Sequence, residues 1–280
     1  MKTIAPNEVP AQVFHSYLLG SVSPRPIAFV SSIDQQGRAN LSPFSFFNCF
    51  GSNPPILVFG PNHRGRDHAP KNTYENVLEV PEVVISMVSY EMVEQMNVSS
   101  GEFARGVNEF VKAGFTEEPS VLVRPPRVRE SPAQFECKVL DVIKPKPDGT
   151  TNLVICEVVL AHFSEQILDE NGRLAPLKTD WIGRMGGDWY VRASGEALFH
   201  VARPVKGIGF DQIPDFIKHS SLLTGNELGK LANVESLPSA DDIQTYQQQL
   251  GALDESLRFE QAKTLLANNQ VREAWLTLLG

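Results

Sequence analysis

Hydroxyl and amide side chains recur between residues 23 and 48, in a stretch that is otherwise apolar. An apolar run over residues 27–30 leads into Ser31 and Ser32, and the chain then turns at residues 34–37. It returns over residues 40–48, where amide and hydroxyl groups alternate with aromatic rings. Apolar walls with a few directed hydrogen-bonding groups suit a planar cofactor with a polar rim and a phosphate tail. A buried β-hairpin with a polar tip explains the same residues, and both interpretations stay open.

A second polar cluster, Lys71, Asn72 and Thr73, stands at the start of a helix-compatible run over residues 72–79. The polar loop before it, residues 62–68, carries two arginines. Backbone N–H groups at a helix start, joined by a cation and a hydroxyl, form a cradle for a phosphate group. A solvated helix start with an ordinary cap fits these residues as well, so the phosphate site is one of two interpretations.

The third candidate is a glycine-rich segment bounded by aromatic residues, WIGRMGGDWY at residues 181–190. Its glycines let the backbone approach a ring closely, and Arg184 could meet an anionic group. A glycine turn that carries surface aromatics is the equal alternative.

Other chemistries lack the residues that they need. The six histidines include no His-x-x-x-His pair and no His/Cys cluster in the sequence, which argues against a metal site. No Gly-x-Ser-x-Gly motif occurs, and no side chain is predicted to act as a catalytic nucleophile or base. Residues 207–212 begin like a dinucleotide-binding motif, but Gln212 stands where the third glycine belongs.

The composition is typical of a globular cytoplasmic protein. The 280-residue chain is 42% hydrophobic and has a net charge of −8, from 25 basic and 33 acidic residues. This acidic excess argues against nucleic-acid binding, which needs a basic face. The three cysteines, Cys49, Cys137 and Cys156, are scattered, which suits a reducing cytosol. No run of about eighteen apolar residues occurs, so no membrane span is expected.

Short runs rich in Val, Ile and Phe predict strands over residues 27–33, 56–59, 83–88, 135–142 and 153–160. Turn residues bound these runs, and Asp148-Gly149 between the last two indicates a hairpin. A parallel doubly wound sheet needs a helix after every strand, and too few helices are predicted here. An antiparallel barrel is therefore favoured.

Two helices are expected beside the strands. The first covers residues 72–79, and the second covers residues 101–113, with Ser99 or Ser100 as its cap and Gly114 as its stop.

The sequence pattern changes after about residue 204. Apolar residues recur at spacings of three and four from a helix start at Ser239 to the end of the chain. The sequence thus predicts two domains, a barrel over residues 1–203 and a helical extension over residues 204–280.

Taken in order, these segments resemble the flavin reductase-like, FMN-binding split-barrel family, in its flavoredoxin-like subgroup. The resemblance covers about residues 10–203. Its motifs are SPRPIAFVSSID, NLSPFSFFN, KNTYENV, VNEFVKAGF, ESPAQFEC and GRMGGDWY. It implies a mainly β fold, a six-stranded antiparallel Greek-key split barrel with peripheral helices, which forms a homodimer and holds FMN near the subunit interface.

The resemblance also implies roles for individual residues. Contacts to FMN are implied for Ser31 and Ser32 beside the ring, Asn40, Leu41 and Ser42 along its edge, Ser45 and Phe46 towards the ribityl and phosphate end, and Lys71, Asn72 and Thr73 at the phosphate. Arg184 is the further candidate for cofactor binding. Asn72 replaces an acid that is usual in the family, so any interaction that needs a carboxylate there is in doubt.

The activity implied is that of an NAD(P)H-dependent flavin reductase, in which NADH or NADPH passes a hydride to N5 of the flavin. Oxygen, free flavin, an oxygenase or a redox protein would then accept the electrons. A non-enzymatic FMN electron carrier of flavoredoxin type is the second hypothesis. A split barrel that has lost flavin and serves as an interaction module is the third.

Overall fold

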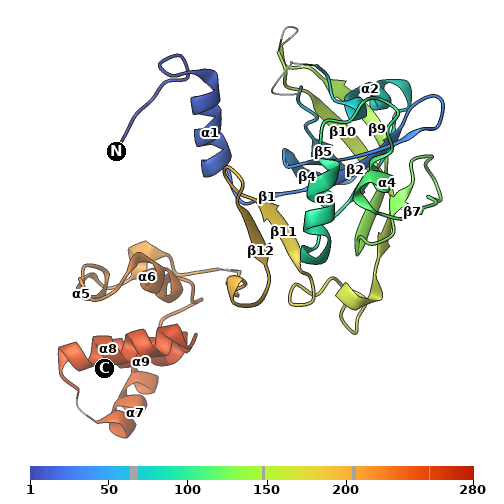
Figure 1. Cartoon of the computed structure of the whole chain (residues 1–280). Coiled ribbons are helices and arrows are strands. Elements are labelled where there is room, and N and C mark those ends of the chain that lie inside the picture. Colours follow the sequence, from blue (N-terminus) through green and yellow to red (C-terminus); the bar gives the residue numbers. More distant parts are fainter. Residues whose placement is uncertain (64–68, 147–148, 204–205, 252) are drawn as a thin grey trace. The chain divides into compact units, whose positions relative to one another are not determined.

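The computed structural model describes residues 1–63, 69–146, 149–203, 206–251 and 253–280 (Figure 1). Contacts divide the chain into two compact units, Met1–Phe199 and His200–Gly280. The boundary between residues 203 and 204 stays a prediction, because residues 204 and 205 lie outside the described part of the chain.

An antiparallel sheet forms the centre of the first unit. Its strand order is β3 (Ala39–Phe44), β2 (Ala28–Ile33), β6 (Glu82–Ser86), β9 (Ala133–Ile143), β10 (Leu153–Phe163), β5 (Pro55–Phe59) and β4 (Phe47–Ser52). All neighbours pair antiparallel, which confirms the predicted mainly β architecture. Among the described residues this sheet has seven strands rather than the six expected, because β4 also pairs with β5.

Smaller elements surround this sheet. One small sheet contains β1 (Arg25–Pro26), β11 (Trp181–Arg184) and β12 (Tyr190–Ala193), and another contains β7 (Glu117–Glu118) and β8 (Arg127–Val128). The helices of this unit are α1 (Ala11–Ser21), α2 (Asn72–Glu79), α3 (Val93–Ser99) and α4 (Glu109–Ala113). Helix α2 has the bounds that the sequence predicts. Strands β9 and β10 pair antiparallel, as the predicted hairpin requires. The turn predicted at residues 148–149 includes residue 148, which lies outside the described residues.

The helix predicted over residues 101–113 is wrong in its first half, since α4 covers only the last five residues of that range. Gly106 has a φ of +86°, a conformation that interrupts a right-handed helix. The cap is Asn108, whose side chain accepts a backbone hydrogen bond of 2.9 Å, while Ser99 ends the preceding helix. Gly114 stops α4 as predicted, with a φ of +71°.

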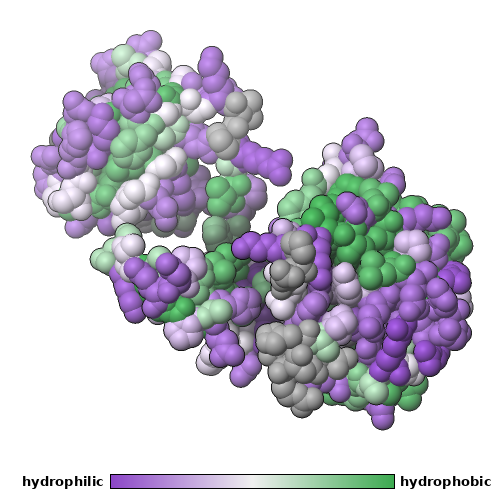
Figure 2. Space-filling model, turned by 90° about the horizontal axis from the view of Figure 1, so that it is seen from above, coloured by the Kyte–Doolittle hydropathy of each residue, from purple (hydrophilic) through white to green (hydrophobic). Residues whose placement is uncertain are grey.

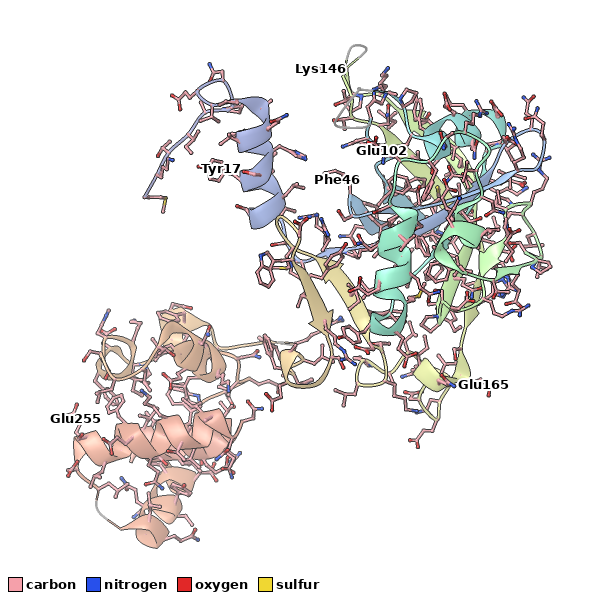
Figure 3. All side chains as sticks on the ribbon, viewed as in Figure 1. Tyr17, Phe46, Glu102, Lys146, Glu165 and Glu255 are labelled. Atoms are coloured by element: carbon pink, nitrogen blue, oxygen red, sulfur yellow. The ribbon has the colours of Figure 1, made fainter. Side chains whose placement is uncertain are left out.

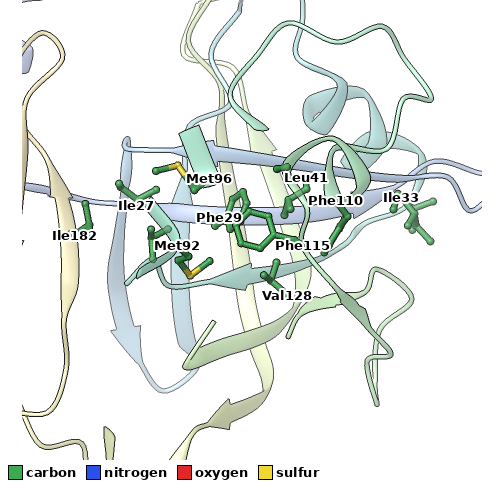
Figure 4. Close-up of a cluster of buried hydrophobic side chains, with 14 residues drawn as sticks. Ile27, Phe29, Ile33, Leu41, Met92, Met96, Phe110, Phe115, Val128 and Ile182 are labelled. Atoms are coloured by element: carbon green, nitrogen blue, oxygen red, sulfur yellow. The ribbon is translucent and has the colours of Figure 1, made fainter. Parts of the chain in front are cut away.

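The side chains of β2 alternate between two apolar clusters, one on each face of the sheet. Phe29 and Ile33 belong to the first cluster, with Leu41 of β3 and residues of α3 and α4 (Figure 4). Val30 belongs to the second, with Val77 of α2 and residues of β5, β9 and β10. All of β2 is buried, so adjacent residues of this strand face different interiors.

The second unit is helical, as the sequence predicts for this part of the chain. It contains α5 (Asp215–Lys218), α6 (Gly225–Ala232), α7 (Ala240–Leu250), α8 (Glu255–Ala267) and α9 (Val271–Leu279). Ser239 caps α7, which confirms the predicted helix start. The core of this unit centres on Trp275, whose indole N–H donates to the carbonyl oxygen of Leu231 at 3.0 Å.

The surface of the molecule carries both hydrophilic and hydrophobic residues. Figure 2 shows hydrophobic residues gathered on one side of the barrel unit, among otherwise polar surroundings. Exposed apolar side chains of this unit include Phe50 on β4 and Leu140 and Ile143 on β9. Within the described ranges, no helix is both long and apolar enough to cross a membrane.

Candidate functional site

The residues predicted beside the cofactor ring lie on two opposite faces of the β2–β3 pair. Ser31 pairs with Leu41, and Ser32 pairs with Asn40. Strand side chains alternate, so Ser31 and Leu41 face the cluster around Phe29, whereas Ser32 and Asn40 face α2. Both serines are fully buried. Their hydroxyl groups therefore do not converge on one point.

The face towards α2 brings three predicted residues together. The side-chain amide of Asn40 donates to the hydroxyl of Thr73 at 3.4 Å, which joins β3 to the first turn of α2. The amide of Asn76, one turn later, donates to the hydroxyl of Ser32 at 3.1 Å. All four side chains are buried. This polar junction fixes the start of α2 against the strands.

The start of α2 has features that suit an anion. Lys71 occupies the N-cap position without capping the helix through its side chain, whereas α6, α7 and α8 are all capped by side chains. Asn72 donates a 3.4 Å hydrogen bond to the carbonyl oxygen of Phe103. Lys71 and Asn72 are half-buried. Residues 64–68 of the polar loop lie outside the described residues.

Two buried acceptors at this junction have no hydrogen-bond partner among the residues that the structure describes. They are the side-chain carbonyl oxygens of Asn40 and Asn76. Buried polar atoms in folded proteins are nearly always hydrogen-bonded, so these oxygens call for a donor from water or a ligand. Ser42 lies on the same face of β3, half-buried, two residues after Asn40.

The opposite face carries a separate cavity of about 200 Å³. Ser45 and Arg184 line it, together with Tyr190, Met96, Asn97 and Ser100. The Arg184 guanidinium lies over the Tyr190 ring, with 4.5 Å between its central carbon and the ring centroid. It also lies 3.8 Å from the carboxylate of Asp188, which is fully exposed. The cavity thus has a cation stacked on an aromatic wall.

Arg25, in the SPRP motif, positions this second face and was not predicted as a site residue. Its guanidinium donates to the carbonyl oxygens of Leu19 and Val22 in and after α1, and to that of Met185 after β11. Its Nε lies 3.5 Å from the hydroxyl of Ser45. A buried arginine with this many acceptors locks three segments of the chain beside the cavity.

Asn76 and Glu109 were also missed, although both stand in quoted motifs. The Glu109 carboxylate is 2% exposed and accepts a 3.0 Å hydrogen bond from the backbone N–H of Leu41. Burial raises the pKa of Glu109, even though that N–H favours the charged form. An acidic residue within an apolar helical run was the available signal, and so was an asparagine three residues after Thr73, on the same helix face.

Phe46 stands at the rim of the barrel and is exposed (Figure 3). Its ring centroid lies 6.0 Å from that of His15 in α1. Helix α1 buries none of its residues and leaves Val13, Tyr17 and Leu18 exposed. The predicted contact residue Phe46 is therefore accessible to a ligand, unlike Ser31 and Ser32.

Several features of the described residues suit a bound organic cofactor. No group of three His, Cys, Asp or Glu side chains within the described ranges could hold a metal. Instead, an uncapped helix start, buried acceptors without partners and a cation over an aromatic ring occur within one unit. A ligand with an anionic tail suits the helix start and the acceptors on the α2 face, whereas the cation and ring on the opposite face belong to the separate cavity.

Comparison with known proteins places these features in context. The profile of the family described as "flavin reductase like domain" matches residues 19–178, which include every predicted contact residue except Arg184. An uncharacterized protein of Aquifex aeolicus is 40% identical over 194 residues, which cover 69% of this chain and 97% of that protein.

Two solved structures are similar in both sequence and fold. One is nitrilotriacetate monooxygenase component B from Bacillus cereus, with 28% identity and a TM-score of 0.66 over 72% of this chain and 98% of the other. The second is the 2-nitrobenzoate 2-nitroreductase of Pseudomonas fluorescens, with 29% identity and a TM-score of 0.65 over 74% and 100%. The family match ends before the helical unit begins.

Proposed function

The chain belongs to the flavin reductase-like domain family, and from that membership we propose that it is an FMN-binding oxidoreductase that uses NADH or NADPH. The observation that carries the choice of cofactor is the polar junction between β2, β3 and α2. It holds an uncapped helix start, with Lys71 and Thr73. Strand β3 of this junction leads directly into Ser45 and Phe46, which are at least partly exposed. This arrangement supports a ligand that ends in a phosphate.

In this proposal Lys71, Asn72 and Thr73 bind the phosphate through the backbone and side-chain donors of the first turn of α2. Ser42, Ser45 and Phe46 contact the ligand directly, because all three are at least partly exposed. Four predicted contact residues are buried and act indirectly, because they fix the strands next to the ligand contacts. They are Ser31, Ser32, Asn40 and Leu41. Arg184 provides a further cation at the cavity on the other face.

Bound FMN would supply a ring that accepts a hydride from the reduced nicotinamide at N5. The protein's part is to bind, orient and exclude water, and none of the proposed contacts needs to act as a nucleophile or base. Glu109 is a buried carboxyl of this region, and it accepts a hydrogen bond from the N–H of Leu41 rather than facing open solvent.

We further propose a cytoplasmic homodimer. The exposed apolar side chains of α1 support a partner subunit there, since a helix that buries nothing within its own chain gains stability from packing. The similarity to component B of a monooxygenase favours an oxygenase as electron acceptor. A redox protein, oxygen and free flavin remain alternative acceptors.

Absorption and rapid mixing test the proposal. We expect freshly purified protein, supplemented with FMN, to absorb near 450 nm and to bleach when it is mixed with NADH or NADPH. A protein that binds FMN but stays oxidised with both nicotinamides is an electron carrier. A protein that never binds flavin is an interaction module, and the proposal is then lost.

Two substitutions test the phosphate cradle, and a third serves as a control. Lys71→Ala and Thr73→Ala should each weaken FMN binding by roughly tenfold or more, which corresponds to about 1.4 kcal/mol. Lys112→Ala removes an exposed lysine on α4 and should leave the dissociation constant unchanged. If all three variants bind FMN as the native protein does, the phosphate lies elsewhere.

A further inference from the structure

The helical unit contains a cavity of about 490 Å³ between α7, the start of α8 and the end of α9. Ligand sites for small organic molecules usually have volumes of about 300–1,000 Å³, so this cavity is large enough for one. Half-buried Leu250 and Leu253 and buried Leu276 form its apolar wall. Tyr246, Gln247 and Arg258 add hydrogen-bonding groups. The flavin site of the proposed function lies in the other unit, so this cavity is unrelated to it.

Arg258 gives the cavity its chemical character. Its Nε is buried and has no hydrogen-bond partner. No ion pair joins its guanidinium to a carboxylate of the residues that the structure describes. A buried donor without an acceptor is destabilising, and a ligand that supplies the acceptor removes that cost. Arg258 is half-buried as a residue, but its enclosed Nε–H lacks an acceptor, and an anion that enters the cavity would supply one.

The surroundings of Arg258 favour a carboxylate over a cation. The described residues that line the cavity include one cation, Arg258, and no acidic side chain. Two acids precede Arg258 at the start of α8. The carboxylate of Asp254 caps the helix by accepting from the N–H of Leu257 at 2.9 Å. Glu255 borders a different cavity with Arg258 and is not among the residues that line this one. A guanidinium presents two parallel N–H donors, which match the two oxygens of a carboxylate.

We propose that this cavity binds a small organic carboxylate. The carboxylate pairs with Arg258, and an apolar body of about six to ten atoms packs against the leucine wall, with Tyr246 and Gln247 at its polar edge. This binding is independent of flavin and of electron transfer.

The experiment uses the full-length protein with hexanoate and benzoate as probes. Hexanamide and benzamide are their neutral counterparts and keep the apolar body. Calorimetry and ligand-observed NMR should detect saturable binding of at least one carboxylate, with its amide weaker by about tenfold or more. Arg258→Gln should weaken carboxylate binding by a similar factor. Lys263→Gln removes an exposed cation of the same helix and should change nothing.

A second variant protects the test against misfolding of Arg258→Gln. Leu253→Trp leaves the guanidinium in place but fills the cavity, and it too should reduce carboxylate binding. The thermal midpoint of each variant, followed by circular dichroism, shows that it is folded. Two results overturn the proposal. One is the absence of saturable binding by either carboxylate, and the other is binding that survives both Arg258→Gln and Leu253→Trp.

Discussion

The side-chain amide of Asn76 donates a 3.1 Å hydrogen bond to the hydroxyl of Ser32, and this bond ties the middle of α2 to β2. A second side-chain hydrogen bond, from the amide of Asn40 to the hydroxyl of Thr73, connects the first turn of the same helix to β3. Both bonds are buried and therefore shielded from competing water. They hold the first turns of α2 in a fixed position relative to β2 and β3. A residue that touches no ligand can thus control a binding site at the helix end.

Replacing Asn76 should therefore affect both stability and binding. Asn76→Ala removes a buried hydrogen bond and leaves the Ser32 hydroxyl without its donor, which should lower the free energy of unfolding by about 1–3 kcal/mol. Under the proposed function, FMN binding weakens as well. Urea unfolding and flavin titration measure the two effects separately. Asn171→Ala, at an exposed turn, should change neither, and unchanged stability of Asn76→Ala would show that the bond is dispensable.

Replacing Arg25 by lysine, which keeps the positive charge but not the guanidinium, should destabilise the protein. Lysine has a single ammonium group and cannot reach the carbonyl oxygens of Leu19, Val22 and Met185 together. Arg25→Lys should lower the free energy of unfolding by about 2 kcal/mol and speed hydrogen exchange in residues 11–22. Arg173→Lys, at an exposed position, is the matched control. Equal exchange in the two variants would mean that Arg25 does not anchor α1.

The raised pKa of Glu109 predicts the direction in which the stability of the protein changes with pH. Burial raises the pKa of this carboxyl in the folded protein above its unfolded value of about 4.3. The folded state therefore binds the proton of Glu109 more tightly than the unfolded state does. The stability that this group contributes is fully present below about pH 4.3 and is lost as the pH rises through the raised pKa of the folded state. Glu109→Gln cannot ionise, and its amide oxygen can still accept from Leu41. Its stability relative to the native protein should improve between pH 4 and pH 8.

Urea unfolding of both proteins across that pH range measures the difference. Glu109→Ala, which leaves the Leu41 N–H without an acceptor, should be less stable at every pH by about 1–3 kcal/mol. If the difference between Glu109→Gln and the native protein does not change with pH, Glu109 does not titrate between pH 4 and pH 8.

The three cysteines should differ sharply in reactivity. Burial raises the pKa of Cys156 to about 12, and it raises that of Cys137 as well, whereas Cys49 is exposed on β4. Thiolates react and thiols do not, so a disulfide reagent should modify one thiol per native chain and three after unfolding. Cys49→Ser should abolish the native reaction. A native count of three would show that the barrel opens on the timescale of the assay.

The sequence predicts elements well where local signals agree and poorly where they compete. Residues 72–79 form the expected helix, because turn residues precede a run without glycine or proline. The range 101–113 fails, because Gly106 outweighs the helix-compatible residues around it. The strand β4 was missed, because its mostly exposed residues do not show the alternation of a half-buried strand.

The sequence also predicts poorly which residues of the candidate site lie near one another in space. Ser31 and Ser32 are adjacent in sequence and were expected at one ring, yet strand geometry sends their side chains to opposite faces. That follows from β-pleating and could have been anticipated. The Asn40–Thr73 contact could not, because it joins residues 33 positions apart whose approach depends on packing of the whole barrel. The phosphate-binding role of Lys71, Asn72 and Thr73 stays a prediction.

The separation of the cores has an evolutionary consequence. The clusters around Phe29 and Val30 lie within the first unit, and the cluster around Trp275 is built wholly from residues of the second. A coding segment that specifies its own interior can be gained, lost or exchanged by recombination without new mutations elsewhere. The matched family region ends before the helical unit, so descent of the barrel can be traced separately from that of its appendage. The segments that encode the two units can therefore have different ancestries.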